Sequence, residues 1–248
     1  MNKRRLYILI MSIGVAFSTA YAQLGEPRND WAFGVNGGVT VNRVSFKPSV
    51  SQAWNVAPTA GLTVRYTSEL YYKVLCSLQL EVNYANMGWN EDIILADGTY
   101  SKDAPTPQTY RRNMHYLQVP VLARLALGKE HRGAMGYLIL GPQVGWLMSE
   151  KAEQSNFWEP SDRINGRHEQ YDLKAKNSFD YGITGGLGCE LNTKAGHFLI
   201  EGRYYFGLAN IFGASKADAF SRSANGAIIG KVTYLISPDL FKKNKNAR

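Results

Sequence analysis

The sequence has 248 residues, a formal net charge of +8 and a hydrophobic fraction of 45%, with only two cysteines and four histidines. The positive charge is scattered through segments of alternating polarity instead of forming a stripe, so the composition gives little reason to expect nucleic-acid binding. No cysteines or histidines have the spacing of a metal site, and we expect neither a metal nor another cofactor.

The first 22 residues have the pattern of a cleaved secretory signal peptide. Three basic residues at 3–5 precede an apolar stretch at 6–17, and residues 20–22 form an Ala-Tyr-Ala cleavage site. Cleavage there would leave Gln23 at the N-terminus, with no cysteine at the junction to carry a lipid. The mature chain would keep about 226 residues, enough for one domain, and we expect its own fold to hold it in the membrane.

The rest of the chain divides into eight segments in which apolar and polar residues alternate. Because no apolar stretch of about 18 residues follows the leader, a helical membrane span is not expected. Side chains alternate across a strand, so one face of each segment suits lipid and the other suits a tight, polar interior. The segments lie at about 31–42, 59–66, 76–84, 117–125, 135–148, 179–191, 198–206 and 225–236. The fifth is nearly apolar throughout, and its faces stay undecided.

The connections between these segments are alternately short and long, which is typical of an outer-membrane β-barrel with periplasmic turns and extracellular loops. The short ones are 68–71, 128–132 and 192–196, and the long ones are 45–55, 90–112, 149–177 and 209–224. Aromatic residues gather near the segment ends, where we expect them at the membrane interface. They include Tyr71, Tyr72, Trp89, Tyr110, Trp146 and Tyr205.

The pattern therefore predicts an all-β protein, an eight-stranded antiparallel transmembrane β-barrel after an N-terminal signal peptide. Residues 1–22 would be the signal peptide, 23–30 a short periplasmic segment, 31–236 the barrel and 237–248 a basic, solvated periplasmic tail. A water-soluble lipocalin-type barrel is the alternative, and it would have charge outside and an apolar cavity inside. The polar face here mixes glycine with opposite charges, which favours the membrane barrel in the outer membrane of a Gram-negative cell.

Nine inward polar residues are the candidate interior network. A proton or ion path is one interpretation, and a structural plug of paired charges is the one we favour, because buried ionised groups must be paired or hydrogen-bonded. The residues are Arg65, Glu81, Gln118, Arg124, Asp180, Glu190, Glu201, Arg203 and Lys231.

Several motifs resemble the PorT-like family of small outer-membrane β-barrels from Bacteroidetes. They are Tyr-Leu-x-x-Pro at 116–120, Gly-Pro at 141–142 and Glu-x-Arg-Tyr-Tyr-x-Gly-Leu-x-Asn at 201–210. The chain departs from the family at Gln118, where glutamate is usual, which weakens any claim of a fixed ion pair there. The resemblance implies an outer-membrane barrel and, for PorT itself, a part in protein export by the type IX secretion system.

Four functional classes follow from these features. The first is a non-enzymatic accessory or scaffold component of protein secretion, which would bind proteins of a secretion machine. The second is a structural or surface-interaction barrel. A small channel is less expected, because side chains fill an eight-stranded lumen. A lipid-modifying enzyme would need a nucleophile and a base that meet, and no Ser, His and acid share a lipid-facing segment, so no catalytic residues are assigned.

The expected partners are outer-membrane lipid, lipopolysaccharide and proteins of a secretion machine. The long connection at 149–177 is the most plausible protein-contact surface, because it combines aromatic and charged residues. Its candidate contact residues are Phe157, Trp158, Glu159, Asp162, Arg163 and Arg167.

Overall fold

The computed structural model describes residues 26–129, 133–156, 158–160, 169–213, 215 and 218–238. The signal peptide expected at 1–22 and the tail from 239 onward lie outside the described residues. The elements are β1 (Glu26–Lys47), β2 (Gln52–Ala53), β3 (Asn55–Tyr71), β4 (Val74–Glu91), a 3-10 turn (Ser101–Asp103), β5 (Tyr110–Gly128), β6 (Gly133–Gln154), α2 (Glu169–Asp172), β7 (Phe179–Thr193), β8 (Gly196–Gly207) and β9 (Arg222–Ile236). Among the described residues, no helix has both the length and the apolar character needed to cross a membrane.

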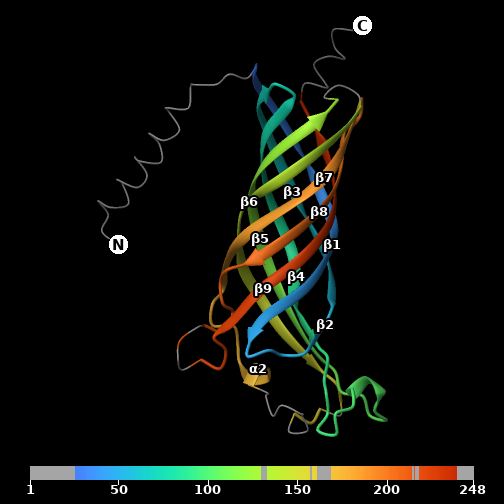
Figure 1. Cartoon of the computed structure of the whole chain (residues 1–248), viewed down its shortest axis with the longest axis vertical. Helices are drawn as coiled ribbons and strands as arrows, with labels where there is room; N and C mark the ends of the chain where they lie inside the picture. Colours follow the sequence, from blue (N-terminus) through green and yellow to red (C-terminus); the bar gives the residue numbers. More distant parts are fainter. Residues whose placement is uncertain are drawn as a thin grey trace, which may run out of the picture.

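Eight of the strands form a closed antiparallel ring (Figure 1). The ring runs β1, β3, β4, β5, β6, β7, β8 and β9, and β9 pairs again with β1 from Phe33↔Ile236 to Lys47↔Arg222. The two-residue strand β2 pairs with the end of β4 and does not span the wall. The closed ring satisfies the backbone hydrogen bonds of every strand, as a bilayer requires, and it confirms the predicted eight-stranded barrel.

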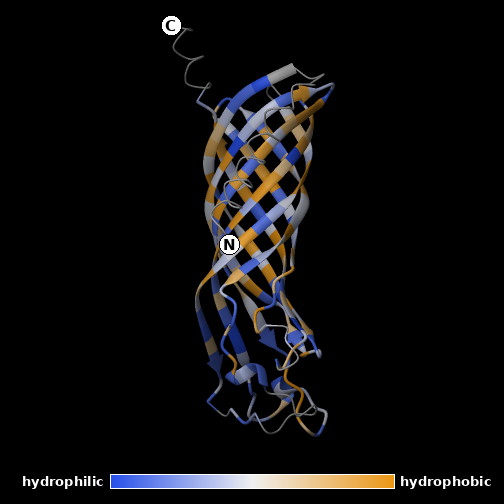
Figure 2. Ribbon diagram, turned by 90° about the vertical axis from the view of Figure 1, so that its left-hand side faces the viewer, coloured by the Kyte–Doolittle hydropathy of each residue, from blue (hydrophilic) through white to orange (hydrophobic). Residues whose placement is uncertain are grey.

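Hydrophobic and hydrophilic residues alternate along the strands (Figure 2), and the ring sorts their side chains between its outside and its inside. On the outside, Leu62, Leu187 and Ile200 have 63%, 65% and 67% of their surface exposed. On the inside, their sequence neighbours Thr63 and Glu201 are buried. An apolar exterior around an interior that holds buried charges is the reverse of a soluble barrel, so the lipocalin alternative is excluded.

The structure also assigns the two faces of β6, which the sequence left undecided. Leu138, Leu140 and Trp146 point outward, whereas Tyr137 and Ile139 are buried inside the ring. Both faces of this strand are apolar because its inward residues meet other buried apolar side chains. The alternation signal therefore disappears although the strand itself is regular.

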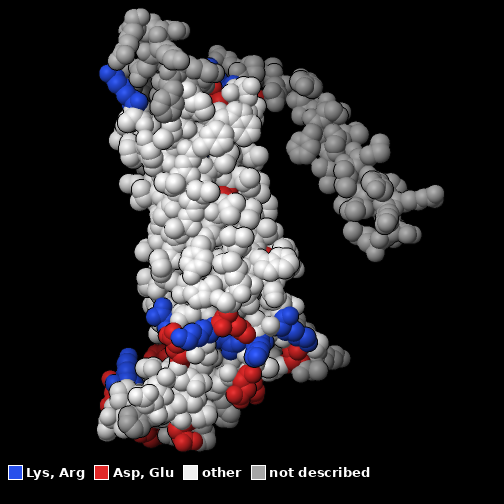
Figure 3. All heavy atoms as spheres, turned by 180° about the vertical axis from the view of Figure 1, so that it is seen from behind, with Lys and Arg blue, Asp and Glu red and all other residues white. Residues whose placement is uncertain are grey.

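A belt of charged side chains crosses the outer surface near the end of the barrel that carries the long connections (Figure 3). Above this belt in the figure, the wall is almost free of charge. A strand needs about 9–11 residues to cross a bilayer, but β1 and β6 have 22 residues each. The surplus residues extend the sheet beyond the membrane on the extracellular side, since the short turns mark the periplasmic side.

Several predicted boundaries differ from the observed ones because strands continue where the alternation fades. β1 begins at Glu26, within the expected periplasmic segment 23–30. The first turn, predicted at 68–71, lies between Tyr71 and Val74 instead. β6 continues to Gln154, well into the connection predicted at 149–177. Outside the bilayer, backbone pairing no longer requires an apolar outward face, so polar residues extend the strands.

The two cysteines are both free. Cys76 lies on β4 and Cys189 on β7, and β5 and β6 separate the two strands. A disulfide needs Cα atoms within about 7 Å, and each step around the wall adds about 4.8 Å. The separation of the two strands therefore excludes a disulfide between Cys76 and Cys189.

The lipid face can be tested by placing a charge on it. Leu187→Arg should lower the free energy of unfolding by roughly 2 to 4 kcal/mol, because a guanidinium at mid-membrane depth loses its hydration. Thr184→Ser is the matched control on the same strand, since Thr184 is fully buried inside and serine keeps the hydroxyl that donates to Gln143. Urea unfolding in phospholipid vesicles measures both variants, and equal effects would contradict the assignment of faces.

Candidate functional site

The interior of the barrel contains three groups of buried side chains. An inner apolar layer and the two clusters of an ion network share the periplasmic part of the lumen, as the register pairs Met135↔Glu190 and Ala32↔Arg65 show, and an aromatic plug fills the extracellular end. The inner apolar layer contains Ala32, Leu75, Leu122, Ala126, Met135, Tyr137, Ile139, Leu199 and Leu235.

Glu81 is the centre of the ion network. Its carboxylate accepts two hydrogen bonds from Arg203, at 3.0 and 2.7 Å, and one from Lys231 Nζ at 2.7 Å. The amides of Gln79 and Asn83 donate to the same carboxylate at 2.7 and 2.8 Å. These donors come from three strands and compensate the cost of burying the charges.

Arg203 joins Glu81 to a second carboxylate, that of Glu201. Tyr137 Oη donates to Glu201 at 2.7 Å, and the guanidinium of Arg124 lies 4.1 Å from the centre of the Tyr137 ring. The Tyr137 ring therefore links the ion network to the inner apolar layer.

A second ion cluster surrounds Glu190 near the periplasmic end. Arg65 Nη1 lies 2.7 Å from Glu190 Oε2, and Arg124 contacts the same oxygen. His197 Nδ1 lies 2.8 Å from Glu190 Oε1, and its Nε2 lies 3.1 Å from Ser237 Oγ. The sequence did not predict that an acid, a histidine and a serine would meet here, because the three residues come from β7, β8 and the position directly after β9.

The nine candidate interior residues are all buried, and seven of them belong to these two ion clusters. Asp180 and Gln118 lie apart from the other seven. Asp180 accepts hydrogen bonds from Tyr205 Oη and Asn225 Nδ2, both at 3.0 Å. The Gln118 amide contacts Met87 Sδ at 2.8 Å. Both residues lie at the boundary between the ion network and the aromatic plug.

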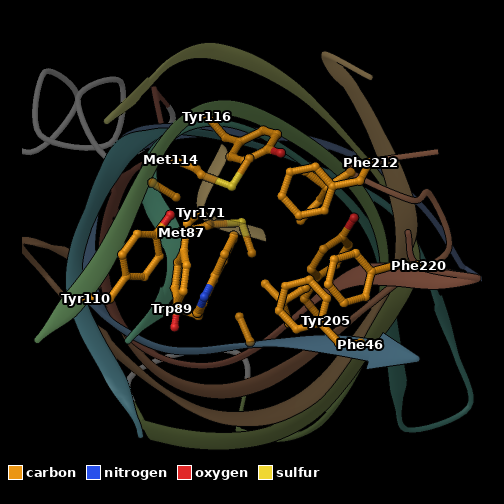
Figure 4. Close-up of a cluster of buried hydrophobic side chains, with 14 of the residues drawn as sticks. Phe46, Met87, Trp89, Tyr110, Met114, Tyr116, Tyr171, Tyr205, Phe212 and Phe220 are labelled. Atoms are coloured by element: carbon orange, nitrogen blue, oxygen red, sulfur yellow. The ribbon is translucent and has the colours of Figure 1, made fainter. Parts of the chain in front are cut away.

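The aromatic plug is a cluster of buried side chains that closes the extracellular half of the lumen (Figure 4). Trp89 lies at its centre, with its ring 5.1 Å from Phe46 and 6.1 Å from Phe212. The buried members are Val44, Phe46, Ala85, Met87, Trp89, Ile93, Tyr110, Met114, Tyr116, Tyr171, Tyr205, Ile211, Phe212, Phe220, Ala227 and Ile229. The sequence predicted a polar interior and did not reveal this plug.

Three aromatic residues predicted for the membrane interface lie in this plug, so that prediction is wrong for them. Trp89, Tyr110 and Tyr205 are at most 1% exposed, whereas Tyr72 is 80% exposed and Trp146 60%. The alternation within each strand carried the missed signal. Tyr205, for example, has the same parity as the inward Arg203 and the opposite parity to the outward Tyr204 and Phe206.

The connection after β6 covers the plug. Arg112, itself buried, donates to the carbonyls of Gln170 and Leu173 at 3.1 and 2.6 Å and pairs with Glu150 at 2.8 Å. These bonds fix α2 over the barrel end, where the Tyr171 ring packs 4.7 Å from that of Tyr110.

Trp158, predicted as a partner contact, packs inward with its ring 4.7 Å from Tyr171. Glu159 is exposed, and its backbone N–H donates to Gln108 Oε1 at 3.0 Å. The other predicted contacts of this connection, Phe157, Asp162, Arg163 and Arg167, lie outside the described residues. In the part of the chain that the structure describes, no three His, Cys, Asp or Glu side chains are grouped to hold a metal ion.

These features define a small outer-membrane β-barrel with an uncharged lipid face and a packed lumen. Residues 21–213 match the family described as outer membrane protein β-barrel domain, and the chain belongs to this family. The protein is therefore located in the outer membrane.

The fold is similar to several solved outer-membrane barrels. OprG from Pseudomonas aeruginosa has 15% identity and a TM-score of 0.43, with 85% of this chain and 95% of that chain covered. Outer membrane protein W of E. coli has 14% identity and a TM-score of 0.40, with 85% and 99% covered. The N-terminal β-barrel domain of Pseudomonas aeruginosa OprF has 11% identity and a TM-score of 0.37, with 85% and 100% covered. No curated protein matches the sequence.

Proposed function

We propose that this protein is a non-enzymatic outer-membrane barrel that acts by binding other proteins, as an accessory or scaffold component of protein secretion. The observation that carries the proposal is the packed lumen, which the ion network, the inner apolar layer and the aromatic plug fill together. A barrel with such an interior offers its outer and end surfaces for function. The link to secretion, and to the type IX system in particular, rests on the motifs that resemble the PorT-like family.

The extension of the sheet beyond the membrane supports this proposal. β1, β4, β5 and β6 have 18 to 22 residues each, more than a bilayer crossing needs, and Arg112 fixes α2 over the end of the barrel. In the described part of the extracellular end, these bonds join the connection after β6 to the strand β5. A preorganised surface loses less conformational entropy when it binds a partner.

Site-specific photo-crosslinking in intact cells tests the proposal. A photoreactive residue is placed at Lys151 on the extracellular side, at Tyr72 in a periplasmic turn, or at Leu187 on the lipid face. The side chains of Lys151 and Tyr72 are well exposed, at 74% and 80%. We expect adducts with subunits of a secretion machine from at least one of these two positions and none from Leu187. Absence of protein adducts from both ends would overturn the proposal.

A channel is a second functional class, which an experiment can distinguish from this proposal. Because the aromatic plug and the ion network fill the lumen, the purified protein in planar bilayers should show no stable, porin-like conductance. Large, long-lived openings would contradict the packed interior. The matched variant is Trp89→Ala, which removes the largest fully buried side chain of the plug.

We do not expect a hydrolase activity from the group formed by Glu190, His197 and Ser237. In a catalytic triad the acid stabilises the imidazolium that forms during the reaction. Here Glu190 already bonds two guanidinium groups, and Asn192 Oδ1 lies 2.6 Å from the same histidine nitrogen. We therefore expect no labelling of Ser237 by a fluorophosphonate probe, with Ser237→Ala as the blank. Labelling that disappears in this variant would establish a reactive serine.

A further inference from the structure

A cavity of about 460 Å³ opens in the barrel wall at the level of the charged belt, where β1, β8 and β9 lie side by side (Figure 1). Its lining combines two arginines, Arg43 and Arg222, with the apolar and aromatic side chains of Trp54, Tyr204 and Phe206. Tyr204 and Phe206 point outward from β8, with 53% and 43% of their surface exposed. The cavity also reaches Val44, Phe46 and Ala227 of the aromatic plug, so it borders the packed lumen on one side and faces the surroundings of the barrel on the other.

Gly226 makes room for this cavity. It is the register partner of Arg43 on β1 and of Phe206 on β8, so it lies in the middle of the lining. A Cβ atom built there would lie 3.6 Å from the carbonyl oxygen of Arg43 and 3.7 Å from Tyr204 Oη, which are ordinary contacts. A larger side chain at this position would therefore project into the cavity without straining the backbone.

Both arginines present their charge to the cavity without a carboxylate partner. Among the described residues, no salt bridge is formed by Arg43 or by Arg222. The Arg43 guanidinium lies 4.8 Å from the Trp54 ring and donates to the carbonyl of Gln52 at 3.2 Å. The Arg222 guanidinium lies 5.3 Å from the Phe206 ring, and its buried Nε has no hydrogen-bond partner. The remaining N–H groups are available to an anion.

The position of the cavity relative to the membrane selects the kind of anion. Going outward along β1, the outward-facing residues from Trp31 to Val41 are uncharged, and Arg43 is the first cation. On β9, the outward residues from Ile236 back to Gly226 are likewise uncharged, and Arg222 is the first cation beyond them. The two guanidinium groups therefore lie at the height of lipid headgroups in the outer leaflet.

The wall below the cavity can receive an acyl chain. Gly202 of β8 and Gly230 of β9 are register partners on the outward face, and a Cβ atom at Gly202 would meet no other atom within 4 Å. Because neither glycine has a side chain, we expect a shallow depression in the apolar wall on the lipid side of Tyr204 and Ile228. A phosphorylated amphiphile could place its phosphate at the arginines and a chain in this depression.

We propose that the cavity binds the phosphate group of a phosphorylated glycolipid of the outer leaflet, held by Arg43 and Arg222. Guanidinium groups form paired, charge-assisted hydrogen bonds with phosphate oxygens. The bond strength rises at a membrane boundary because little water competes there. This inference depends on the outer-membrane location and not on the proposed role in secretion.

Native mass spectrometry of the purified mature protein in detergent tests the proposal with phosphorylated lipid A as the probe. We expect the double variant Arg43→Gln/Arg222→Gln to bind the probe at least about tenfold more weakly, the effect of losing charge-assisted hydrogen bonds. Gly226→Leu should weaken binding as well, because it fills the cavity and keeps both charges. Arg111→Gln, on the outward face of β5, is the matched control and should bind like the unaltered protein.

Three results would overturn the proposal. Dephosphorylated lipid A could bind as tightly as the phosphorylated probe, which would remove the phosphate from the recognition. Inorganic phosphate could displace the probe at equal concentration, which would make the cavity a site for free anions. Arg111→Gln could weaken binding as much as the double variant, which would indicate attraction by the whole belt. Heat-dependent gel mobility verifies that each variant is folded, and Gly226→Leu keeps the test valid if the arginine variants do not fold.

Discussion

Replacing Glu81 by glutamine is expected to lower the free energy of unfolding by about 3 to 5 kcal/mol, because it removes the negative charge that compensates two buried cations. Arg203 and Lys231 both bond this carboxylate, and each of the three side chains is at most 4% exposed. Glutamine has almost the same volume as glutamate, so packing is largely preserved. The loss in the free energy of unfolding therefore measures the effect of the charge. Urea unfolding in phospholipid vesicles provides the measurement.

Two companion variants make this prediction specific. Glu153→Gln alters the exposed pair with Lys151, whose charged atoms lie 3.7 Å apart, and should change stability by less than about 1 kcal/mol. The double variant Glu81→Gln/Lys231→Met removes one of the stranded cations and should recover part of the loss. If Glu81→Gln behaves like Glu153→Gln, the carboxylate does not hold the network together.

Trp89→Ala should destabilise the barrel by roughly 3 to 5 kcal/mol, since it leaves a cavity at the centre of the aromatic plug. The indole ring is fully buried and packs against Phe46, Tyr110 and Phe212. The guanidinium of Arg112 also lies 5.7 Å from the ring, so its removal loosens the contact that supports α2. The same urea titration measures this effect.

Trp89→Phe separates packing from hydrogen bonding at this position. The indole Nε1 is buried and has no hydrogen-bond partner among the described residues, so phenylalanine loses volume but no bond. We expect a loss below about 1.5 kcal/mol, as for other hydrophobic replacements of similar shape. A loss as large as that of Trp89→Ala would show that the N–H group has an essential partner.

The sequence by itself determined the class of fold, the strand number and the lipid face. Each outward residue within the bilayer must be apolar independently of its neighbours, so a local rule of alternation is sufficient to place Leu62 or Leu187 on the outer wall. The same rule placed the nine polar residues inside. It gave no clear answer for β6, because Tyr137 and Ile139 face an apolar layer inside the barrel while Leu138 and Leu140 face lipid.

Only the tertiary structure decided which inward side chains meet. Glu81 is 122 residues from Arg203 and 150 from Lys231 in the sequence, and the contacts follow from closure of the ring and the register between strands. The sequence did not predict the aromatic plug for a related reason. Beyond the ion network, inward side chains need only to fill space, and neither lipid nor water determines their polarity. The wall cavity likewise depends on Arg43, Gly226 and Phe206 being register partners on three strands, a relation that no single segment of sequence contains.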